Sequence, residues 1–311
     1  MVRVTVFILV LALLGVATGA RQGTTPVGDQ TETPAVRFHH VHFNTTDRSK
    51  AIEFFSSRFA AERAMFSAQQ EAVRTDRGWM LFNQVRTSPP WQLTSSIWHI
   101  GWGAKDMPAE YERQLKLGTR FFEPLTDISD IGGNPNVRPG SFYYAYVDGP
   151  DRALIELNTA PNNQFGHLHL LSADPYAAGD WYVRYLGVKP RRRPLAPEPR
   201  FYRGYQIGPS VSFALDGVNV IIFPVEYAMK AYSDQWKGRM SLETTRGRTI
   251  DHIGIAIDNF DETIEKMRLS GIKPVDGERG LMGGSSRSAF IEGPDRISIE
   301  LIENLARPGL N

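Results

Sequence analysis

Four short apolar segments, which read HVHF, HIGW, HLHL and HIGI, carry six of the seven histidines of the chain, and the seventh directly precedes the first segment. They begin at His40, His99, His167 and His252. Each consists of a histidine, an apolar residue, a histidine or glycine, and another apolar residue. This alternation is typical of a strand that buries one face. Its recurrence at four places predicts an internal repeat.

A helix-like stretch follows each of these segments. An aspartate stands six or seven residues after the first histidine, where a helix N-cap is wanted; these are Asp47, Asp106, Asp174 and Asp258. Three stretches end in Gly118, Gly187 or Gly271, which suit the left-handed residue after a helix. Strand-like runs separated by turn residues come next. We therefore expect an α+β protein of four units, each a strand, a helix and several strands.

The second and fourth units share a feature that the others lack. The runs GPDRALIEL (149–157) and GPDRISIEL (293–301) each deliver a strand with a glutamate, Glu156 or Glu300, at its middle. The matching runs of the first and third units, GWMLFNQV and GVNVIIFP, carry apolar residues or Asn there. This alternation predicts two consecutive domains of two units each, residues 35–161 and 165–304.

Each predicted domain contains two first-strand histidines and one last-strand glutamate. The sets are His40, His99 and Glu156 in the first domain, and His167, His252 and Glu300 in the second. Two imidazoles and a carboxylate are the ligands of non-haem Fe²⁺, and Mn²⁺ or Zn²⁺ also accepts them. A histidine on an apolar strand can instead be a hydrogen-bonded core residue. A glutamate there is costly to bury unless a cation or donors compensate it.

Side-chain alternation along a strand sorts the neighbouring histidines. His42 shares the face of His40, whereas His39 points to the other side and is expected to have no effect on a metal. His169 repeats the position of His42. We expect His42 and His169 to act as acid/base groups or to support the ligands, with packing as the alternative. The corresponding positions of the other two units are Gly101 and Gly254, which leave room for a group opposite them.

These residues resemble the vicinal oxygen chelate superfamily, which includes glyoxalase, extradiol ring-cleaving dioxygenases, fosfomycin-resistance proteins and methylmalonyl-CoA epimerase. The resemblance covers nearly all of the chain after its leader and implies four βαβββ modules. In that superfamily two modules form a cup, and the ligands come from the first and last strands of the paired modules. It implies the two ligand sets named above. It also implies a small-molecule substrate whose two adjacent oxygens bind the metal, which acts as a Lewis acid.

The resemblance leaves the reaction open. Two histidines and one glutamate are the set of the extradiol and fosfomycin-resistance groups, whereas glyoxalase usually adds a second carboxylate or Gln. Tyr146 stands where extradiol enzymes carry a tyrosine, and Phe290 takes that place in the second set. The separate acid/base histidine of those enzymes is missing. We expect a metal-dependent extradiol-type dioxygenase or a glyoxalase-like lyase or isomerase, with a metal-free binding protein of the bleomycin-resistance kind, or a purely structural metal, as alternatives.

Two longer segments are expected to cover a cup or form an interface. They are residues 125–140 in the second unit and residues 224–248 between the third and fourth.

Charge and the N-terminal residues set the expected partners and location. The chain has 35 basic and 34 acidic residues, which gives no argument for nucleic acid or an anionic membrane as a partner. Residues 1–20 read as a secretory signal and residues 21–34 as a flexible leader. We therefore expect a periplasmic or extracellular protein, with an uncleaved N-terminal anchor as the alternative. No cysteine is present to form a disulfide. The oligomeric state is left open.

Overall fold

The structure is a computed structural model that describes residues 36–134, 136–192, 198–275, 278–280 and 287–304. The expected secretory signal (1–20) and leader (21–34) lie outside these residues. Among the described residues, no helix has both the length and the apolar character needed to span a bilayer.

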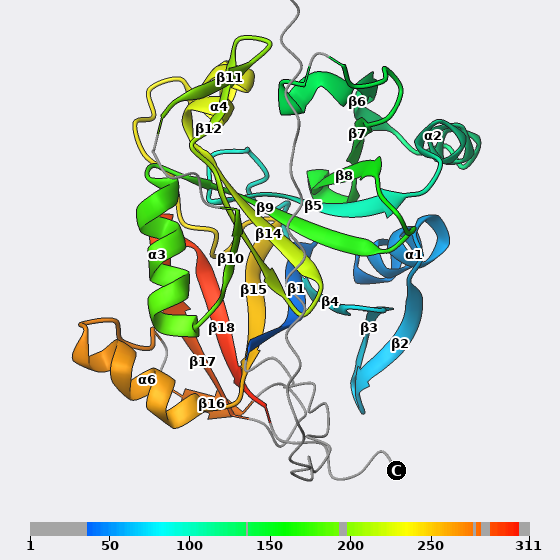
Figure 1. The fold of residues 1–311 in the computed structure, drawn as a ribbon. Coiled ribbons are helices and arrows are strands. Elements are labelled where there is room, and N and C mark those ends of the chain that lie inside the picture. The colour runs from blue at the N-terminus through cyan, green and yellow to red at the C-terminus, as the bar shows by residue number, and fades with distance from the viewer. Residues whose placement is uncertain (1–35, 135, 193–197, 276–277, 281–286, 305–311) are drawn as a thin grey trace, which may run out of the picture. The chain divides into compact units, whose positions relative to one another are not determined.

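The described chain is α+β, and its elements follow the predicted repeat (Figure 1). The strands are β1 (Val36–Thr45), β2 (Glu62–Ser67), β3 (Gln70–Thr75), β4 (Gly78–Gln84), β5 (Ile97–Ala104), β6 (Phe121–Asp127), β7 (Tyr143–Asp148), β8 (Leu154–Thr159), β9 (Phe165–Ser172), β10 (Pro190–Arg192), β11 (Arg200–Tyr202), β12 (Tyr205–Gly208), β13 (Val211–Leu215), β14 (Val218–Pro224), β15 (Ile250–Ile257), β16 (Glu278–Gly280), β17 (Arg287–Glu292) and β18 (Ser298–Glu303). The α-helices are α1 (Arg48–Arg58), α2 (Met107–Lys116), α3 (Pro175–Leu186), α4 (Glu226–Ala231), α5 (Ser233–Trp236) and α6 (Phe260–Leu269).

Four βαβββ modules account for most of these elements. Module 1 runs from β1 to β4, module 2 from β5 to β8, module 3 from β9 to β14 and module 4 from β15 to β18. Module 3 also contains the hairpin β11–β12, and helices α4 and α5 lie between modules 3 and 4. The predicted fold class is therefore confirmed.

The modules do not pair in consecutive order. One sheet has the order β16-β17-β18-β15-β1-β4-β3-β2 and joins module 1 to module 4, while the other has the order β10-β13-β14-β9-β5-β8-β7-β6 and joins module 2 to module 3. The prediction that residues 35–161 and 165–304 each pair their own two modules is thus wrong. The link 160–164 is short enough to keep β9 beside β5, and modules 1 and 4 then complete each other's sheet.

Three of the four predicted helix caps are confirmed. The side chains of Asp47, Asp106 and Asp174 each accept a hydrogen bond from a backbone N–H of the first turn. The fourth prediction is wrong, because Asn259 occupies the N-cap of α6. Asp258 instead pairs with Arg37, which lies on the neighbouring strand β1.

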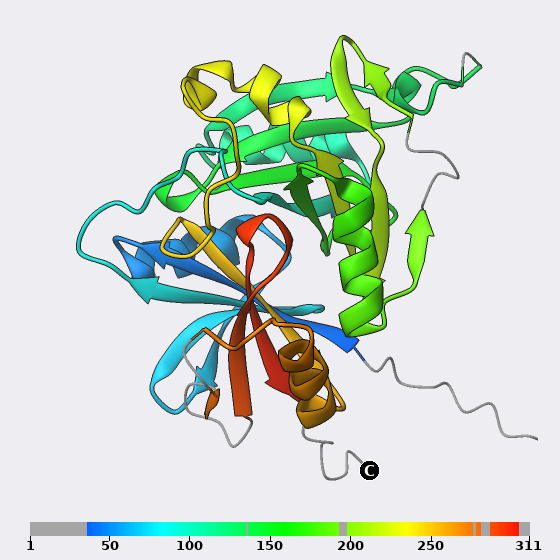
Figure 2. The same ribbon diagram turned by 90° about the vertical axis from the view of Figure 1, so that its left-hand side faces the viewer.

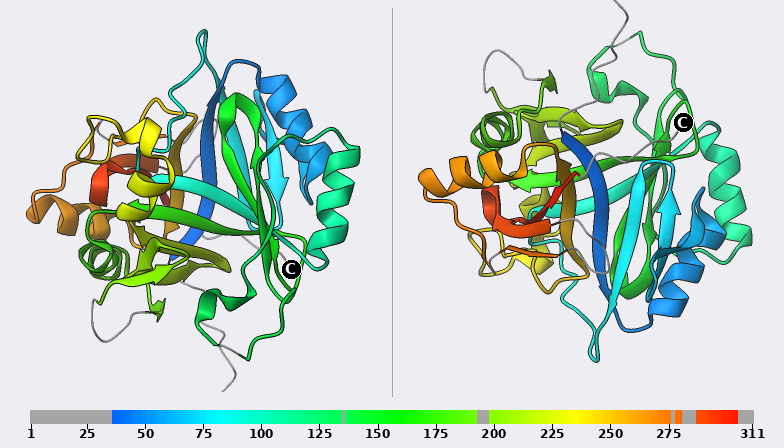
Figure 3. Two further views of the ribbon diagram at one scale, coloured as in Figure 1. Left: turned by 90° about the horizontal axis from the view of Figure 1, so that it is seen from above. Right: turned by 90° about the horizontal axis from the view of Figure 1, so that it is seen from below.

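The two sheets share one hydrophobic core on their helix-bearing sides. Helices α1 and α2 lie together at one side of the described fold and α3 and α6 at the other (Figures 1 and 3). Figure 2 shows the sheet of modules 2 and 3 above that of modules 1 and 4. Trp102 of β5 joins them, because its ring lies 4.6 Å from that of Phe59, 5.9 Å from Phe55 and 5.0 Å from Phe165.

Replacing Trp102 by alanine is expected to lower the free energy of unfolding by about 3–5 kcal/mol, because a large side chain that is 1 % exposed would leave a cavity between the sheets. Urea unfolding followed by circular dichroism measures this change. A loss below about 1 kcal/mol would contradict the shared core.

Candidate metal centres

The first candidate centre is formed by modules 1 and 4, and its three residues are here called the terminal set: His40, His252 and Glu300. His40 Nε2 lies 3.2 Å from His252 Nε2 and 3.4 Å from Glu300 Oε2, and His252 Nε2 lies 3.6 Å from the same oxygen. Ligands about 2.0–2.2 Å from one metal lie roughly 3.0–3.6 Å apart. The three atoms therefore have the spacing of three ligands on one ion.

Each ligand of the terminal set is held by a neighbour through its other polar atom. His252 Nδ1 is 2.5 Å from Asp251 Oδ1, and Ser288 donates a 2.7 Å hydrogen bond to Glu300 Oε1. Burial alone would lower the pKa of His252, but its hydrogen bonds to Asp251 and Glu300 outweigh burial and raise it. Such partners fix the tautomer and the ring orientation of a ligating histidine.

The second candidate centre is formed by modules 2 and 3, and His99, Glu156 and His167 are here called the central set. His99 Nε2 lies 2.9 Å and His167 Nε2 3.8 Å from Glu156 Oε2. Both nitrogens are buried, yet neither makes a well-aligned hydrogen bond within the described residues. Burial would raise the pKa of Glu156, but the two imidazoles outweigh it and hold that pKa well below its usual range.

The predicted ligands are therefore close together, but in other combinations than the sequence suggested. His40 was grouped with His99 and Glu156, and His167 with His252 and Glu300; both groupings are wrong. The cause is strand pairing, because β1 pairs with β15 and β9 pairs with β5. Each set takes one histidine from an odd module, and one histidine and the glutamate from an even module. That the six residues bind metal stays a prediction.

Two glycines make room for a ligand of each set. Gly101 is paired across the ladder with His167, and a Cβ built on Gly101 would lie 1.9 Å from the ring of His167. Gly254 is paired with His40, and its Cβ would lie 2.1 Å from His40 Nδ1. The group expected opposite each glycine is thus the histidine of the partner module.

The donor atoms of both sets fit a divalent metal. Two imidazole nitrogens and one carboxylate oxygen converge in each, and His169 offers a further nitrogen to the central group. The buried His167 Nε2 has no hydrogen bond among the described residues and needs another partner. Three protein ligands leave coordination positions for water or substrate.

His39 does not behave as the alternation predicted. Its Nδ1 lies 2.9 Å from His40 Nδ1, so one of these nitrogens donates to the other. The ladder between β1 and β15 has a register irregularity between Phe38 and His40, which breaks strict alternation at this point. Burial lowers the pKa of His39 to about 4. A neutral His39 can therefore accept a hydrogen bond from His40, and the expectation that His39 has no effect on a metal loses its basis.

His42 and His169 occupy matching places beside the two sets. The His42 ring stacks on that of His252 with a centroid distance of 4.6 Å, and the His169 ring lies 4.4 Å from that of His99. His169 is partly exposed and lines a cavity. Its pKa is lowered well below the ordinary value, chiefly by burial. An acid/base role for either residue remains a prediction.

Replacing His42 by alanine is expected to leave the metal content unchanged, because all three terminal ligands remain. Elemental analysis of the purified variant checks this. Loss of one metal per chain would make His42 a ligand of the terminal set rather than a neighbour of His252.

A cavity of about 500 Å³ lies beside the central set, of which Glu156 contributes to the lining. His169 and Tyr146 also line it, and Tyr146 is paired with Glu156 across β7 and β8. Burial raises the pKa of Tyr146 well above its usual value, so its phenol remains a hydrogen-bond donor. The rest of the lining is mixed: it includes aromatic rings such as Trp98, Tyr144 and Tyr227, and the charged residues Glu123, Arg200 and Arg203.

The two segments expected to cover a cup both contribute to this cavity. Ile128 and Ile131 come from the loop after β6, and Tyr227 comes from α4. The hairpin β11–β12 reaches the same loop, where Tyr202 donates a 2.5 Å hydrogen bond to Asp130. The lining of the cavity beside the central set thus includes both segments and the hairpin.

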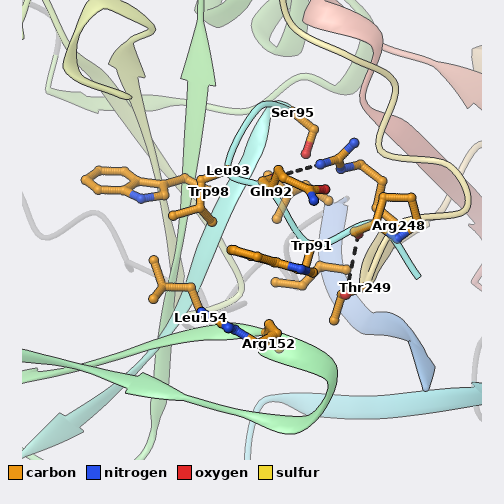
Figure 4. Close-up of a pocket in the computed structure, with 13 residues that line it drawn as sticks. Trp91, Gln92, Leu93, Ser95, Trp98, Arg152, Leu154, Arg248 and Thr249 are labelled. Atoms are coloured by element: carbon orange, nitrogen blue, oxygen red, sulfur yellow. Dashed lines mark hydrogen bonds between the residues drawn. The ribbon is translucent and has the colours of Figure 1, made fainter. Parts of the chain in front are cut away.

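A second, much smaller cavity of about 20 Å³ lies near the start of β15 (Figure 4). Arg152 packs over the ring of Trp91, and the buried Arg248 pairs with Glu243 and donates to the backbone of Gln92. This space holds about one water molecule. Its charged residues therefore join loops of the fold rather than bind a substrate.

Sequence reasoning gave no role to Asp251, Ser288 and Asn219. The signal for Asp251 was its place directly before a ligand histidine, where Trp98 stands in module 2. Asn219 is paired with His167 and lines the cavity, and its Oδ1 has no hydrogen-bond partner among the described residues. Trp79 takes the matching position opposite His40. Neither set therefore has a second carboxylate there.

Sequence comparisons place part of the chain beside known proteins. The family model described as Glyoxalase/Bleomycin resistance protein/Dioxygenase superfamily matches residues 164–301. A lactoylglutathione lyase of Escherichia coli O157:H7 is 29% identical over 140 residues, which are 44% of this chain and 90% of that protein. A probable chloroplastic lactoylglutathione lyase of Arabidopsis thaliana is 30% identical over 162 residues, 49% of this chain and 39% of that protein.

Solved structures share the fold. Glyoxalase I from Zea mays superimposes with a TM-score of 0.64 at 14% identity, covering 86% of this chain and 92% of that chain. A putative dioxygenase from Bacillus subtilis gives a TM-score of 0.52 at 13% identity, covering 88% and 86%. Residues 164–301 thus match the glyoxalase, bleomycin resistance protein and dioxygenase superfamily, and the described fold resembles that of glyoxalase I.

Proposed function

We propose that this protein is a metal-dependent lyase or isomerase that acts on a small molecule with two adjacent oxygens at the central set. The observation that carries the proposal is the convergence of His99, Glu156 and His167 beside a cavity of about 500 Å³. A pocket of this size fits a small organic molecule. The glyoxalase-like relatives support enzymatic activity.

A bound metal would be held by His99 Nε2, His167 Nε2 and an oxygen of Glu156, and would supply Lewis-acid polarisation of a substrate carbonyl. The donor set suits Fe²⁺ and also accepts Mn²⁺ or Zn²⁺. Fe²⁺ remains our first expectation.

His169 is the residue that we assign to proton transfer. Its ring lies 4.4 Å from that of His99 and 5.0 Å from that of His167, measured between centroids, and it lines the cavity. Because its pKa is lowered, the imidazole is neutral near pH 7 and can accept a proton from a substrate carbon. The ring nitrogen of His169 that takes the proton can then return it to the adjacent carbon of the substrate. This would complete an isomerisation without a second carboxylate.

The aromatic side chains of the lining favour an apolar or aromatic group in the substrate, while Arg200 and Arg203 offer positive charge to an anionic group. Trp98 and Phe223 flank His169, with centroid distances of 5.6 and 5.1 Å. Tyr146 places a protonated phenol near Glu156, where it can donate a hydrogen bond to a substrate oxygen.

Extradiol-type dioxygenation is the second candidate. It is favoured by the three-ligand set without a second carboxylate and by Tyr146 on the strand beside Glu156. A metal-free binding function remains the alternative outside catalysis.

One experiment separates these functions. Protein purified without oxygen and loaded with Fe²⁺, Mn²⁺ or Zn²⁺ is given hemithioacetals of 2-oxoaldehydes in deuterated water, and separately catechols with oxygen. Deuterium at the product carbon supports the isomerase, whereas oxygen uptake with ring opening supports the dioxygenase. Ligand binding without turnover by any loaded form would overturn both and favour the binding protein.

Export remains a prediction that bears on the substrate. Chemistry that depends on glutathione needs a cytosolic thiol pool, so an exported protein would use another small molecule. The N-terminal sequence of the mature protein, isolated from its natural compartment, tests cleavage after Ala20.

A further inference from the structure

The two ligand sets differ in the residues that support them, and this difference indicates different affinities. We propose that the terminal set holds its metal at least tenfold more tightly than the central set, as a retained ion that links module 1 to module 4. The central set would then hold the exchangeable ion at which substrate binds. This inference rests on the proposed function, because it takes both sets to bind metal.

Every ligand of the terminal set has a partner on its second polar atom. His252 has Asp251 at 2.5 Å, and Glu300 has Ser288 at 2.7 Å. His40 Nδ1 lies 2.9 Å from His39 Nδ1. Side chains that are already held by hydrogen bonds lose less orientational freedom when the metal binds. A carboxylate that accepts a hydrogen bond from the second ring nitrogen also makes a histidine a stronger ligand.

The central set lacks the matching partners. Trp98 stands before His99 where an aspartate stands before the terminal histidine, and His99 Nδ1 is buried without a hydrogen bond among the described residues. Tyr144 occupies the position that matches Ser288, and its hydroxyl donates to Glu123 at 2.8 Å instead of to Glu156. A glycine, Gly166, precedes the second histidine and offers no side chain.

The ligand atoms are also spaced less evenly in the central set. The two imidazole nitrogens lie 2.9 and 3.8 Å from the carboxylate oxygen, against 3.4 and 3.6 Å in the terminal set. The terminal set is thus closer to the spacing of a bound ion before any ion binds. A single outer partner typically changes metal affinity 10- to 100-fold.

The positions of the sets in the chain suit these two roles. His40 and His252 are 212 positions apart, so a metal between them closes a very long loop. Binding to the folded chain alone then stabilises the fold by mass action. The central set lies beside the large cavity, where a ligand that can exchange gives substrate access to the metal.

The test is a competition titration of the full-length apoprotein with Zn²⁺ against a chromophoric chelator. We expect two binding classes of one ion each, with dissociation constants at least tenfold apart. Gly254→Ala should remove the tight class and Gly101→Ala the weak class. Asp251→Asn should weaken the tight class 10- to 100-fold and leave the weak one unchanged. Asp258→Asn, which removes the same charge just beyond β15, is the matched control and should alter neither.

The outcomes separate this inference from the function on which it rests. Two classes of equal strength, or a tight class that Gly101→Ala removes, would overturn the inference while leaving a metal enzyme. An unaltered tight class in Asp251→Asn would overturn the role of the supporting partners. Absence of any bound metal would overturn the proposed function itself. Thermal unfolding gives a second readout, since filling the tight class should raise Tm in the wild type but not in Gly254→Ala.

Discussion

Alanine at position 101 is expected to empty the central set of metal and abolish turnover. The new methyl group would lie 1.9 Å from the ring of His167, so the ring must swing out of the set. Losing a ligand costs more than losing an outer partner, so we expect affinity to fall more than about 100-fold. Elemental analysis should show one metal fewer per chain.

Gly254→Ala is the matched control for this prediction. Its methyl group would meet His40 Nδ1 at 2.1 Å and displace the ligand of the other set. Each variant should lose one metal and keep the other. If Gly101→Ala kept both metals and full turnover, the site between β5 and β9 would not be the catalytic centre.

Replacing His169 by alanine is expected to lower kcat by about 10²- to 10⁴-fold, the usual contribution of a positioned acid or base. The metal content should stay the same, because His99, Glu156 and His167 remain. Steady-state kinetics with whichever substrate the wild type turns over gives kcat, and elemental analysis gives the metal content.

His42→Ala provides the control for the proton-transfer role, since His42 occupies the same place in the terminal set. Its effect on kcat is expected to stay within about threefold. A similar loss of turnover in both variants would show that the two sets act together. Loss of metal in His169→Ala would instead make His169 a fourth ligand. This is geometrically possible, because a ring nitrogen of His169 lies within 4.8 Å of the central ligand atoms.

The repeat and the ligand residues could be predicted because each depends on local sequence. The alternation in HVHF and HLHL places a histidine on the buried face of its strand whatever the strand pairs with. A glutamate within an apolar strand, such as Glu156, is unusual in any pairing. The α+β fold, the four modules and the residues of both sets followed from these patterns.

Module pairing could not be predicted in the same way. The first strands of all four modules have the same pattern, so β1 can pair equally well with β5 or β15 on local grounds. The choice depends on the short link 160–164 and on contacts between distant residues, such as the Phe38 ring 5.3 Å from that of Phe165. The position of His39 depends on a local irregularity of the β1–β15 ladder, which alternation alone does not predict.

The supporting residues also escaped prediction, since their role depends on what lies beside them. Ser288 is an ordinary strand residue until β17 pairs with β18 and brings it to Glu300. In the sequence, Asn219 stands out only because the third unit has no glutamate on its last strand. Its pairing with His167 makes it part of the cavity wall.

The central claim is that two independent metal sites are built from modules 1 with 4 and 2 with 3. The most direct measurement is the metal-to-protein ratio of the double variant His40→Ala/His252→Ala beside the wild type. We predict two metals in the wild type and one in the double variant, because both histidines belong to the terminal set. A double variant without metal, or a wild type that binds none, would contradict it.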